Sequence, residues 1–240
     1  MFAAALLLSA CGGGGGGGSG SQSASYTFVE PSQGQSQTYA YTLTNFDDTS
    51  AGYNYTSVID QVNADGSYLM TWVPHQSSYT LDGTKFGLST ETDTYDNKGQ
   101  YIEYADGASA INSDFYCYYS YANGGQPASL SPGQSWVNTV SYHCTGSSIV
   151  NTEPSTTVTF VGIESVTVPA GTFSAYKFQY VQTSQGSQAG TSSTSTSTTW
   201  YDTSSTSTRI VKSTTLTTVS GYTPAPTGQK SFDMELASYH

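Results

Sequence analysis

Tight-turn dipeptides recur through the first half of the chain and leave room only for short extended segments between them. Asp65-Gly66, Asp82-Gly83 and Asp106-Gly107 are typical of two-residue hairpin turns, in which the backbone adopts positive φ. Residues 96–99 (DNKG) form a four-residue version. No window shows apolar residues at the three- and four-residue spacing of an amphipathic helix. The sequence therefore predicts an antiparallel meander, because strands that follow one another in sequence usually pair.

Strand-like runs lie between these turns and continue through the second half of the chain. Runs rich in β-branched and aromatic residues cover residues 68–73, 99–104, 136–142, 209–219 and 232–236. Trp200 and Tyr201 are expected to begin a further strand. Residues 183–198, by contrast, are rich in Ser, Thr, Gly and Gln and hold no aromatic residue, so we interpret them as a long mobile hairpin loop.

A hairpin is predicted at residues 168–171 (VPAG). Pro169 suits the second position of a type I turn, and Gly171 suits the left-handed position that follows. This combination predicts a three-residue loop with a bulge. Because side chains alternate along a strand, Tyr176, Phe178 and Tyr180 should then share one face of the next strand.

The composition indicates that aromatic rings replace much of an aliphatic core. Leu, Ile, Val and Phe number 39 of 240 residues, below the roughly 20% under which a charged chain is expected to be disordered. However, 20 Tyr and 3 Trp are present, and each ring can bury about 150–250 Å². The 6 Lys and Arg against 17 Asp and Glu give a net charge of -11. Such a chain repels phosphate backbones, which excludes a nucleic-acid partner.

The predicted fold class is therefore all-β. We expect a single antiparallel domain over residues 26–240, built as a curved sheet or a sandwich-like arrangement. A loop at residues 123–132 separates two halves, 26–125 and 126–240. The domain would lie behind a flexible glycine tether.

The first eleven residues read MFAAALLLSAC, an apolar run that ends in small residues and is typical of a secretory signal. Leu8-Ser9-Ala10-Cys11 resembles the lipobox of bacterial lipoproteins. The resemblance implies that residues 1–10 are a signal peptide and that Cys11 becomes the lipidated first residue. No Lys or Arg precedes the run. The alternatives are therefore a natural start upstream of Met1, or a free Cys11 after a chance apolar run.

A tether follows the cysteine. Residues 12–18 are seven consecutive glycines, and we interpret residues 11–25 as a lipidated Cys with a flexible Gly/Ser linker. Gly12 directly after the Cys resembles an outer-membrane sorting signal. This predicts a bacterial cell-envelope protein whose membrane contact is an N-terminal lipid anchor. No run of about 20 apolar residues, the length that a spanning helix needs, occurs in the chain.

A second resemblance involves residues 162–177 (GIESVTVPAGTFSAYK). Residues 133–136 (GQSW) precede this segment, and Trp200-Tyr201 and Val211-Lys212 follow it. Over residues 130–215 the pattern resembles the DUF3108-like group of periplasmic proteins and lipoproteins of unknown function. Residues 202–205 (DTSS) stand where that group has a Pro-x-x-Gly turn. The resemblance implies no catalytic residues. It also implies a likeness to the lipoprotein-carrier fold, a curved antiparallel sheet around an apolar cavity.

Two cysteines remain if Cys11 is lipidated. Cys117 and Cys144 would form a pair in an oxidising compartment, so we expect a disulfide between them. Two buried free thiols are the alternative. A zinc site made of both cysteines and His143 is less favoured, because no Cys-x-x-Cys spacing supports it.

Catalytic signatures are weak. The histidines are His75, His143 and His240, but the chain has no Gly-x-Ser-x-Gly nucleophile elbow, so a hydrolase is the least favoured function. We expect His75 to be exposed and the terminal His240 to be disordered. We predict no catalytic residues and no cofactor.

Clustered acids are the remaining candidates for a metal site. They are Asp47, Asp48, Glu91, Asp93 and Asp96. A twelve-residue calcium loop does not fit around Gly66 or Gly99, because Trp72 and Ala105 occupy required ligand positions. We therefore interpret these residues as solvated turn acids and predict no metal.

Tyrosines crowd residues 116–121. Alternation places Cys117, Tyr119 and Tyr121 on one face of a strand, with Tyr116 and Tyr118 on the other. Rings on both faces predict a sheet that lines a cavity or presents a platform, and such surfaces suit sugars or acyl chains.

The leading hypothesis is thus a non-catalytic, lipid-anchored envelope protein that binds a hydrophobic ligand, a glycan or an envelope partner. A structural or surface-display lipoprotein without a small ligand is the second hypothesis, and a hydrolase is the third.

Overall fold

The computed structural model describes residues 26, 28–106, 116–122, 125, 127, 130–145, 150–186, 189–204, 209–223 and 228–240. The predicted signal peptide (1–10) and the tether (11–25), with Cys11, lie outside these residues and stay predictions.

The strands are β1 (Ser36–Asn45), β2 (Ser50–Val62), β3 (Tyr68–Pro74), β4 (Ser78–Leu81), β5 (Thr84–Gly87), β6 (Glu91–Tyr95), β7 (Tyr101–Asp106), β8 (Tyr116–Tyr121), β9 (Ser135–Asn138), β10 (Val140–Cys144), β11 (Asn151–Thr152), β12 (Thr156–Val168), β13 (Gly171–Gln185), β14 (Ser192–Asp202), β15 (Ile210–Ser220) and β16 (Gln229–Tyr239). Among the described residues, none belongs to a helix long and apolar enough to cross a membrane.

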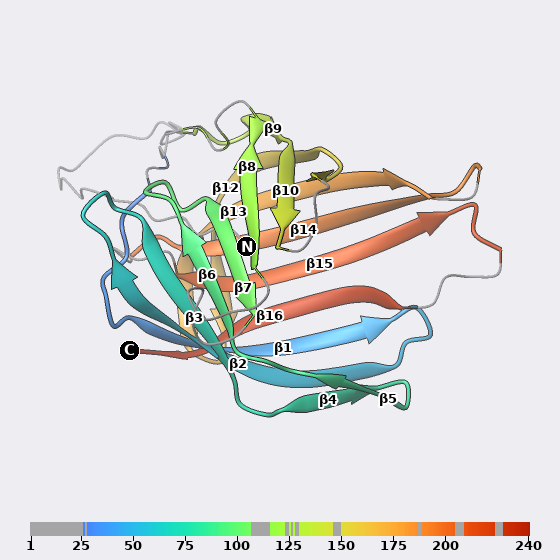
Figure 1. Ribbon diagram of the computed structural model, residues 1–240, viewed down its shortest axis with the longest axis horizontal. Helices are drawn as coiled ribbons and strands as arrows, with labels where there is room; N and C mark the ends of the chain where they lie inside the picture. Colours follow the sequence, from blue (N-terminus) through green and yellow to red (C-terminus); the bar gives the residue numbers. More distant parts are fainter. Residues whose placement is uncertain are drawn as a thin grey trace, which may run out of the picture.

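One antiparallel sheet of fourteen strands dominates the fold (Figure 1). Its strand order is β11-β10-β8-β7-β6-β3-β2-β1-β16-β15-β14-β13-β12-β9, and β4 and β5 form a separate hairpin. The first and last strands of the chain, β1 and β16, pair at its centre. Both predicted halves therefore share one continuous sheet, and the prediction of an all-β, antiparallel, curved fold is confirmed.

The two ends of the sheet approach each other around Thr139. β9 pairs with β12 at one end of the strand order, whereas β10 pairs with β8 near the other end. Thr139 alone separates β9 from β10 in sequence. Its carbonyl accepts a hydrogen bond from the Ala122 N–H, and its hydroxyl lies 2.9 Å from the Ser155 hydroxyl. The sheet therefore curls round, as Figure 1 shows.

The prediction of one strand over residues 136–142 is consequently wrong. The backbone leaves one ladder after Asn138 and enters a distant one at Val140. A run of strand-forming residues indicates an extended backbone, but it does not indicate which strand each residue will pair with.

The inner face of the curled sheet holds a core made largely of rings. Tyr176 and Phe178 of β13 are buried there, and Tyr180 is partly buried, as the alternation predicted. Met234 and Leu236 of β16 are buried on the same side. Tyr26 reaches this core from before β1 and meets Phe178 edge to face. Aromatic area thus replaces the scarce aliphatic area.

The predicted hairpin turns are confirmed where the residues are described. Asp82 and Gly83 both have positive φ and join β4 to β5. Gly66 and Gly99 also have positive φ in the turns before β3 and β7. Gly171 has a φ of 134°, but it pairs with Val168. The loop at this hairpin therefore has two residues, Pro169 and Ala170, rather than the predicted three.

The prediction of a mobile loop over residues 183–198 is wrong. β13 extends to Gln185 and β14 begins at Ser192, so most of this segment is a strand pair. Hydroxyls face each other across the ladders, with Thr183 3.2 Å from Thr194 and Ser197 2.8 Å from Thr215. Thr is a strand former, and such cross-strand pairs stabilise a sheet without aromatic rings. Trp200 and Tyr201 end β14 rather than begin a strand.

The predicted disulfide is confirmed. Cys117 of β8 and Cys144 of β10 are joined, and they are direct partners in the β8–β10 ladder. The alternatives of two free thiols and of a zinc site with His143 are therefore excluded. The bond fixes the final residue of β10 beside β8.

Replacing both cysteines (Cys117→Ser with Cys144→Ser) should lower the free energy of unfolding by about 3 kcal/mol, since the disulfide closes a loop of 27 residues. Urea unfolding of this variant and of its parent, both in a Cys11→Ser background, measures the difference. The oxidised parent treated with dithiothreitol should show the same loss. Unchanged unfolding midpoints in both comparisons would contradict the expectation.

Candidate functional site

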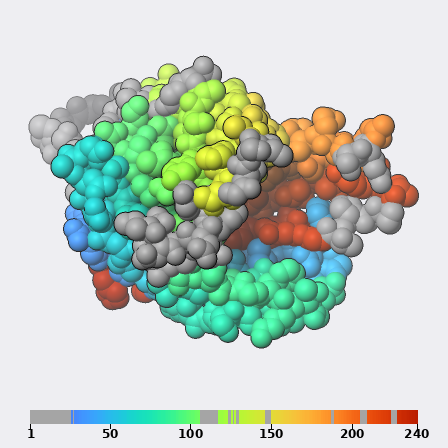
Figure 2. All heavy atoms as spheres, viewed as in Figure 1, coloured from blue at the N-terminus to red at the C-terminus, as the bar shows by residue number. Residues whose placement is uncertain are grey.

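The molecule is hollowed on one side of the curled sheet. Figure 2 shows the hollow between the β4–β5 hairpin below and the strands β7, β8 and β10 above, with atoms of the C-terminal strands at the back. Inward-facing residues of the sheet line two cavities here, and the two cavities share Phe232 of β16.

The larger cavity has a volume of about 470 Å³ and mostly aromatic walls, and we call it the aromatic cavity. Its lining residues come from β1, β2, β3, β6, β7, β16, the hairpin and the segment after it: Tyr41, Tyr53, Tyr55, Trp72, Tyr79, Phe86, Gly87, Leu88, Glu91, Asp93, Tyr101, Tyr104 and Phe232. This volume lies within the range of about 300–1,000 Å³ that is usual for small-molecule sites.

A stack of four rings forms one wall of the aromatic cavity. Tyr41 stacks on Tyr53 at 5.0 Å, Tyr53 on Tyr79 at 5.0 Å, and Tyr79 on Phe86 at 5.2 Å between ring centroids. Tyr55 meets both Tyr41 and Tyr53 edge to face. The stack ties the β4–β5 hairpin to the sheet, so the hairpin forms part of the cavity wall. Burial raises the pKa of Tyr41 and Tyr53, which keeps both phenols neutral.

A buried carboxylate lies in the same wall. Asp93 is 7% exposed, and its Oδ2 accepts hydrogen bonds from the Trp72 indole N–H at 2.8 Å and the Tyr95 hydroxyl at 3.2 Å. Tyr101 also donates a hydrogen bond to this carboxyl group. Burial raises the pKa of Asp93, and the hydrogen bonds from Trp72, Tyr101 and Tyr95 offset part of that rise. The donors hold the carboxyl group at a fixed position beside the cavity.

The smaller cavity, of about 290 Å³, has a different chemistry, and we call it the hydroxyl-lined cavity. Strands β12 to β16 supply its walls: Thr156, Tyr180, Gln182, Ser195, Ser197, Thr199, Tyr201, Ile210, Ser213, Thr215, Phe232 and Met234. Several of these hydroxyls hydrogen-bond to one another across strands, including Thr199 with Ser213 at 3.0 Å. The hollow is therefore aromatic at one end and rich in hydroxyl groups at the other.

The prediction of solvated turn acids holds for some of the acids and fails for Asp93. Asp47 accepts hydrogen bonds from Thr49, and Asp96 accepts them from the backbone of Lys98 and Gln100, as expected of acids in turns. Asp93 is buried instead, because it alternates with Glu91 and Tyr95 on the inner face of β6. Within the described residues, no three His, Cys, Asp or Glu side chains are grouped so that they could hold a metal ion.

The histidines do not assemble a catalytic site in the described part of the chain. His143 is exposed and stacks on Tyr118, in a shallow cavity whose described lining holds Ser120 and Ser141 but no carboxylate. His75 is exposed, as predicted, and its Nε2 lies 2.8 Å from the Thr56 hydroxyl. The prediction that His240 is disordered is wrong, because its backbone forms hydrogen bonds with Ser36 in both directions. These bonds extend the central β1–β16 ladder to the last residue.

Tyr118 and Cys117 lie on opposite faces of β8, as the alternation predicted. Tyr118 is 45% exposed, whereas Cys117 is buried and Tyr119 packs against Tyr101 and Tyr142.

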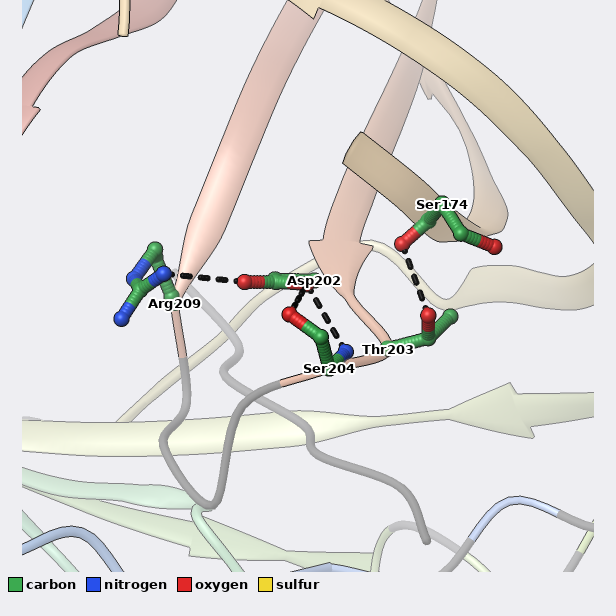
Figure 3. Close-up of polar contacts among 5 residues, drawn as sticks. All are labelled: Ser174, Asp202, Thr203, Ser204 and Arg209. Carbon is green, nitrogen blue, oxygen red and sulfur yellow. Dashed lines mark hydrogen bonds and ion pairs between the residues drawn. The ribbon is translucent and has the colours of Figure 1, made fainter. Parts of the chain in front are cut away.

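A second polar cluster, at the end of β14, stabilises the fold (Figure 3). Asp202 accepts hydrogen bonds from the Ser204 N–H and hydroxyl through Oδ1, and from Arg209 Nη1 at 2.9 Å through Oδ2. Both the N–H and the hydroxyl of Thr203 donate to the Ser174 carbonyl. The cluster ties the end of β14 to Arg209, just before β15, and to Ser174 of β13.

Comparisons with known proteins identify no family. No protein-family model matches the sequence, and no curated protein matches it. The resemblance to the DUF3108-like group therefore stays an expectation.

Three solved bacterial structures resemble the chain at low identity. One, provisionally described as an exported protein with a YmcC-like fold from Bacteroides fragilis, has a TM-score of 0.47 and 15% identity over 89% of this chain and 99% of its own. A protein provisionally described as a lipoprotein from Parabacteroides distasonis has a TM-score of 0.42 and 14% identity, over 89% and 99%. The hypothetical lipoprotein YmcC from Escherichia coli has a TM-score of 0.39 and 12% identity, over 84% of each chain. Likenesses of this size do not establish a function for this chain.

The sequence predicted an apolar cavity but not the residues that line it. Trp72 and Asp93 lie on different strands and meet only because β3 pairs with β6. One local signal was present: Glu91, Asp93 and Tyr95 alternate at the spacing of one strand face. A carboxylate between inward-facing positions is the pattern that indicates a buried acid.

Proposed function

We propose that this protein is a non-catalytic binding protein of the bacterial cell envelope, held at the outer membrane by a lipid on Cys11. Its ligand would occupy the aromatic cavity and extend past Phe232 into the hydroxyl-lined cavity. The single observation that carries the proposal is this pair of cavities, which share Phe232 as a lining residue. Ligand sites of this kind combine apolar walls with a few fixed polar groups.

The chemistry of the walls favours binding over catalysis. The aromatic cavity offers ring faces, and the carboxyl group of Asp93 is already engaged by hydrogen bonds from Trp72 and Tyr95. The hydroxyl-lined cavity offers Ser and Thr side chains, and the described residues of its lining include no histidine, lysine or carboxylate that could activate such a hydroxyl. Reversible binding of a small amphiphilic molecule is what this arrangement supports.

Native mass spectrometry tests the proposal. The full chain carrying Cys11→Ser would be exported to a bacterial periplasm behind a cleavable signal and purified gently. We expect a bound small molecule that leaves on denaturation, and its mass would name the ligand class. A bare polypeptide that also fails to take up an uncharged apolar dye would contradict the proposal and favour the structural or surface-display role.

A further inference from the structure

The buried carboxyl group of Asp93 is the unusual feature of the aromatic cavity. Asp93 is buried, and the groups that hydrogen-bond to it, from Trp72, Tyr95 and Tyr101, are neutral donors. Burial favours the neutral form of this carboxyl group, whereas a cation beside it would favour the ionised form. Glu91, in the same cavity wall, adds a second carboxyl group. A cation that enters the cavity would therefore be paired with a carboxylate, because its charge favours the ionised form of Asp93.

The lysine and arginine side chains of the protein lie outside the described lining of both cavities. All six Lys and Arg lie in the described part of the chain, and none of them belongs to the described lining of either cavity. Four are paired with other acids in the ion pairs Lys177–Glu164, Arg209–Asp202, Lys212–Glu235 and Lys230–Asp48. In the described lining of the aromatic cavity, no lysine or arginine therefore lies beside the carboxyl groups.

The ring faces add to this preference. The face of an aromatic ring carries partial negative charge, and a cation within about 6 Å of the ring centroid is attracted to it. The stacked rings of Tyr41, Tyr53 and Tyr79 and the indole of Trp72 all line the cavity that holds Asp93. Rings combined with a carboxylate match an alkylated ammonium group, which is charged, apolar at its surface and unable to donate a hydrogen bond.

We propose that the aromatic cavity binds the quaternary ammonium group of an organic cation, with the rest of the ligand directed toward the hydroxyl-lined cavity. This inference rests on the proposed function, because it names the ligand class of the same site.

A sugar hydroxyl fits the cavity less well. Oδ2 of Asp93 already accepts hydrogen bonds from Trp72 and Tyr95, and Tyr101 donates to the same carboxyl group, so little acceptor capacity is left for a sugar. The existing hydrogen bonds do not prevent the carboxylate from attracting a cation, because charge attraction does not need a free lone pair. An anionic head group would be repelled by the same carboxylates.

Isothermal titration of choline and of its uncharged carbon analogue, in which a quaternary carbon replaces the nitrogen, tests the inference. The two probes share one shape and differ in charge. With the full chain carrying Cys11→Ser, we expect choline to bind about tenfold more tightly than the analogue, consistent with cation–π and charge attraction. Asp93→Asn should reduce this preference to about twofold or less. Glu103→Gln is the matched control, because Glu103 lies on the neighbouring strand β7 outside the cavity lining and its loss removes the same charge.

Each outcome decides the inference. Equal binding of the two probes, or an undiminished preference in Asp93→Asn, would overturn it while leaving the cavity a binding site. Failure of choline, the analogue and the uncharged dye N-phenylnaphthylamine to bind at all would sink the proposed function as well. If Asp93→Asn does not fold, Glu91→Gln carries the test, and an unchanged preference in that variant would likewise overturn the inference.

Discussion

Arg209→Ala is expected to lower the free energy of unfolding by about 3–5 kcal/mol, the usual cost of breaking a buried ion pair from one side. The Asp202 side chain is 1% exposed and the Arg209 side chain 15%, and their charged atoms lie 2.9 Å apart. Removing the guanidinium leaves the buried carboxylate with its bonds to Ser204 but without a counter-charge. It also removes the stacking of Arg209 over Tyr239 at 3.8 Å. Urea unfolding of the Cys11→Ser parent and variant measures the loss.

Lys177→Ala is the matched control for this prediction. Lys177 forms an ion pair with Glu164, but the two side chains are 29% and 44% exposed. Solvent screens such a pair, and its removal should cost at most about 1 kcal/mol. Losses of equal size in the two variants would show that the Asp202–Arg209 pair contributes no more than a surface contact.

The local features of the fold could be predicted from the sequence because their causes are local. Asp82-Gly83 and Gly66 form turns because their backbone needs positive φ, which the residue types themselves reveal. The disulfide between Cys117 and Cys144 followed from counting: a lipidated Cys11 leaves one pair. Alternation alone placed Tyr176 and Phe178 on the buried face of β13.

Features that depend on distant partners could not be predicted. Nothing around Thr139 marks the point where the chain crosses from one end of the sheet to the other, since the hydrogen-bond partners of Asn138 and Val140 lie on β12 and β8. The strands within residues 183–198 could not be predicted for a related reason. A lack of aromatic residues suggested a loop, but the hydroxyl pairs that stabilise these strands become visible only when β13, β14 and β15 are aligned.

The candidate site has some features that could be predicted from the sequence and others that could not. The abundance of Tyr predicted aromatic walls and a cavity, which the ring stack from Tyr41 to Phe86 provides. The burial of Asp93 was not predicted, because two acids at positions 91 and 93 resemble a solvated turn until β6 is placed beside β3 in the sheet. The charge of the cavity, and with it the ligand class that we infer, therefore required the three-dimensional structure.

Phe178→Ala is expected to lower the free energy of unfolding by about 3–5 kcal/mol, because deletion of a buried ring removes its transfer free energy and leaves a cavity. Phe178 is 1% exposed and lies in the middle of the ring core. Its centroid is 5.0 Å from Phe160, 5.4 Å from Tyr26 and 5.7 Å from Tyr201. These partners come from separate elements, so the surrounding backbone cannot close the gap from one side alone.

Phe86→Ala deletes the same atoms from an exposed position and serves as the matched control. Phe86 is 41% exposed on β5 and contacts Tyr79 at the end of the ring stack, so its loss should cost about 1 kcal/mol or less. Thermal or urea unfolding of both variants separates the two sites. A small loss for Phe178→Ala, similar to that for Phe86→Ala, would mean that the core tolerates a missing ring. It would contradict the view that aromatic packing on the inner face, rather than the backbone ladder alone, holds the curled sheet together.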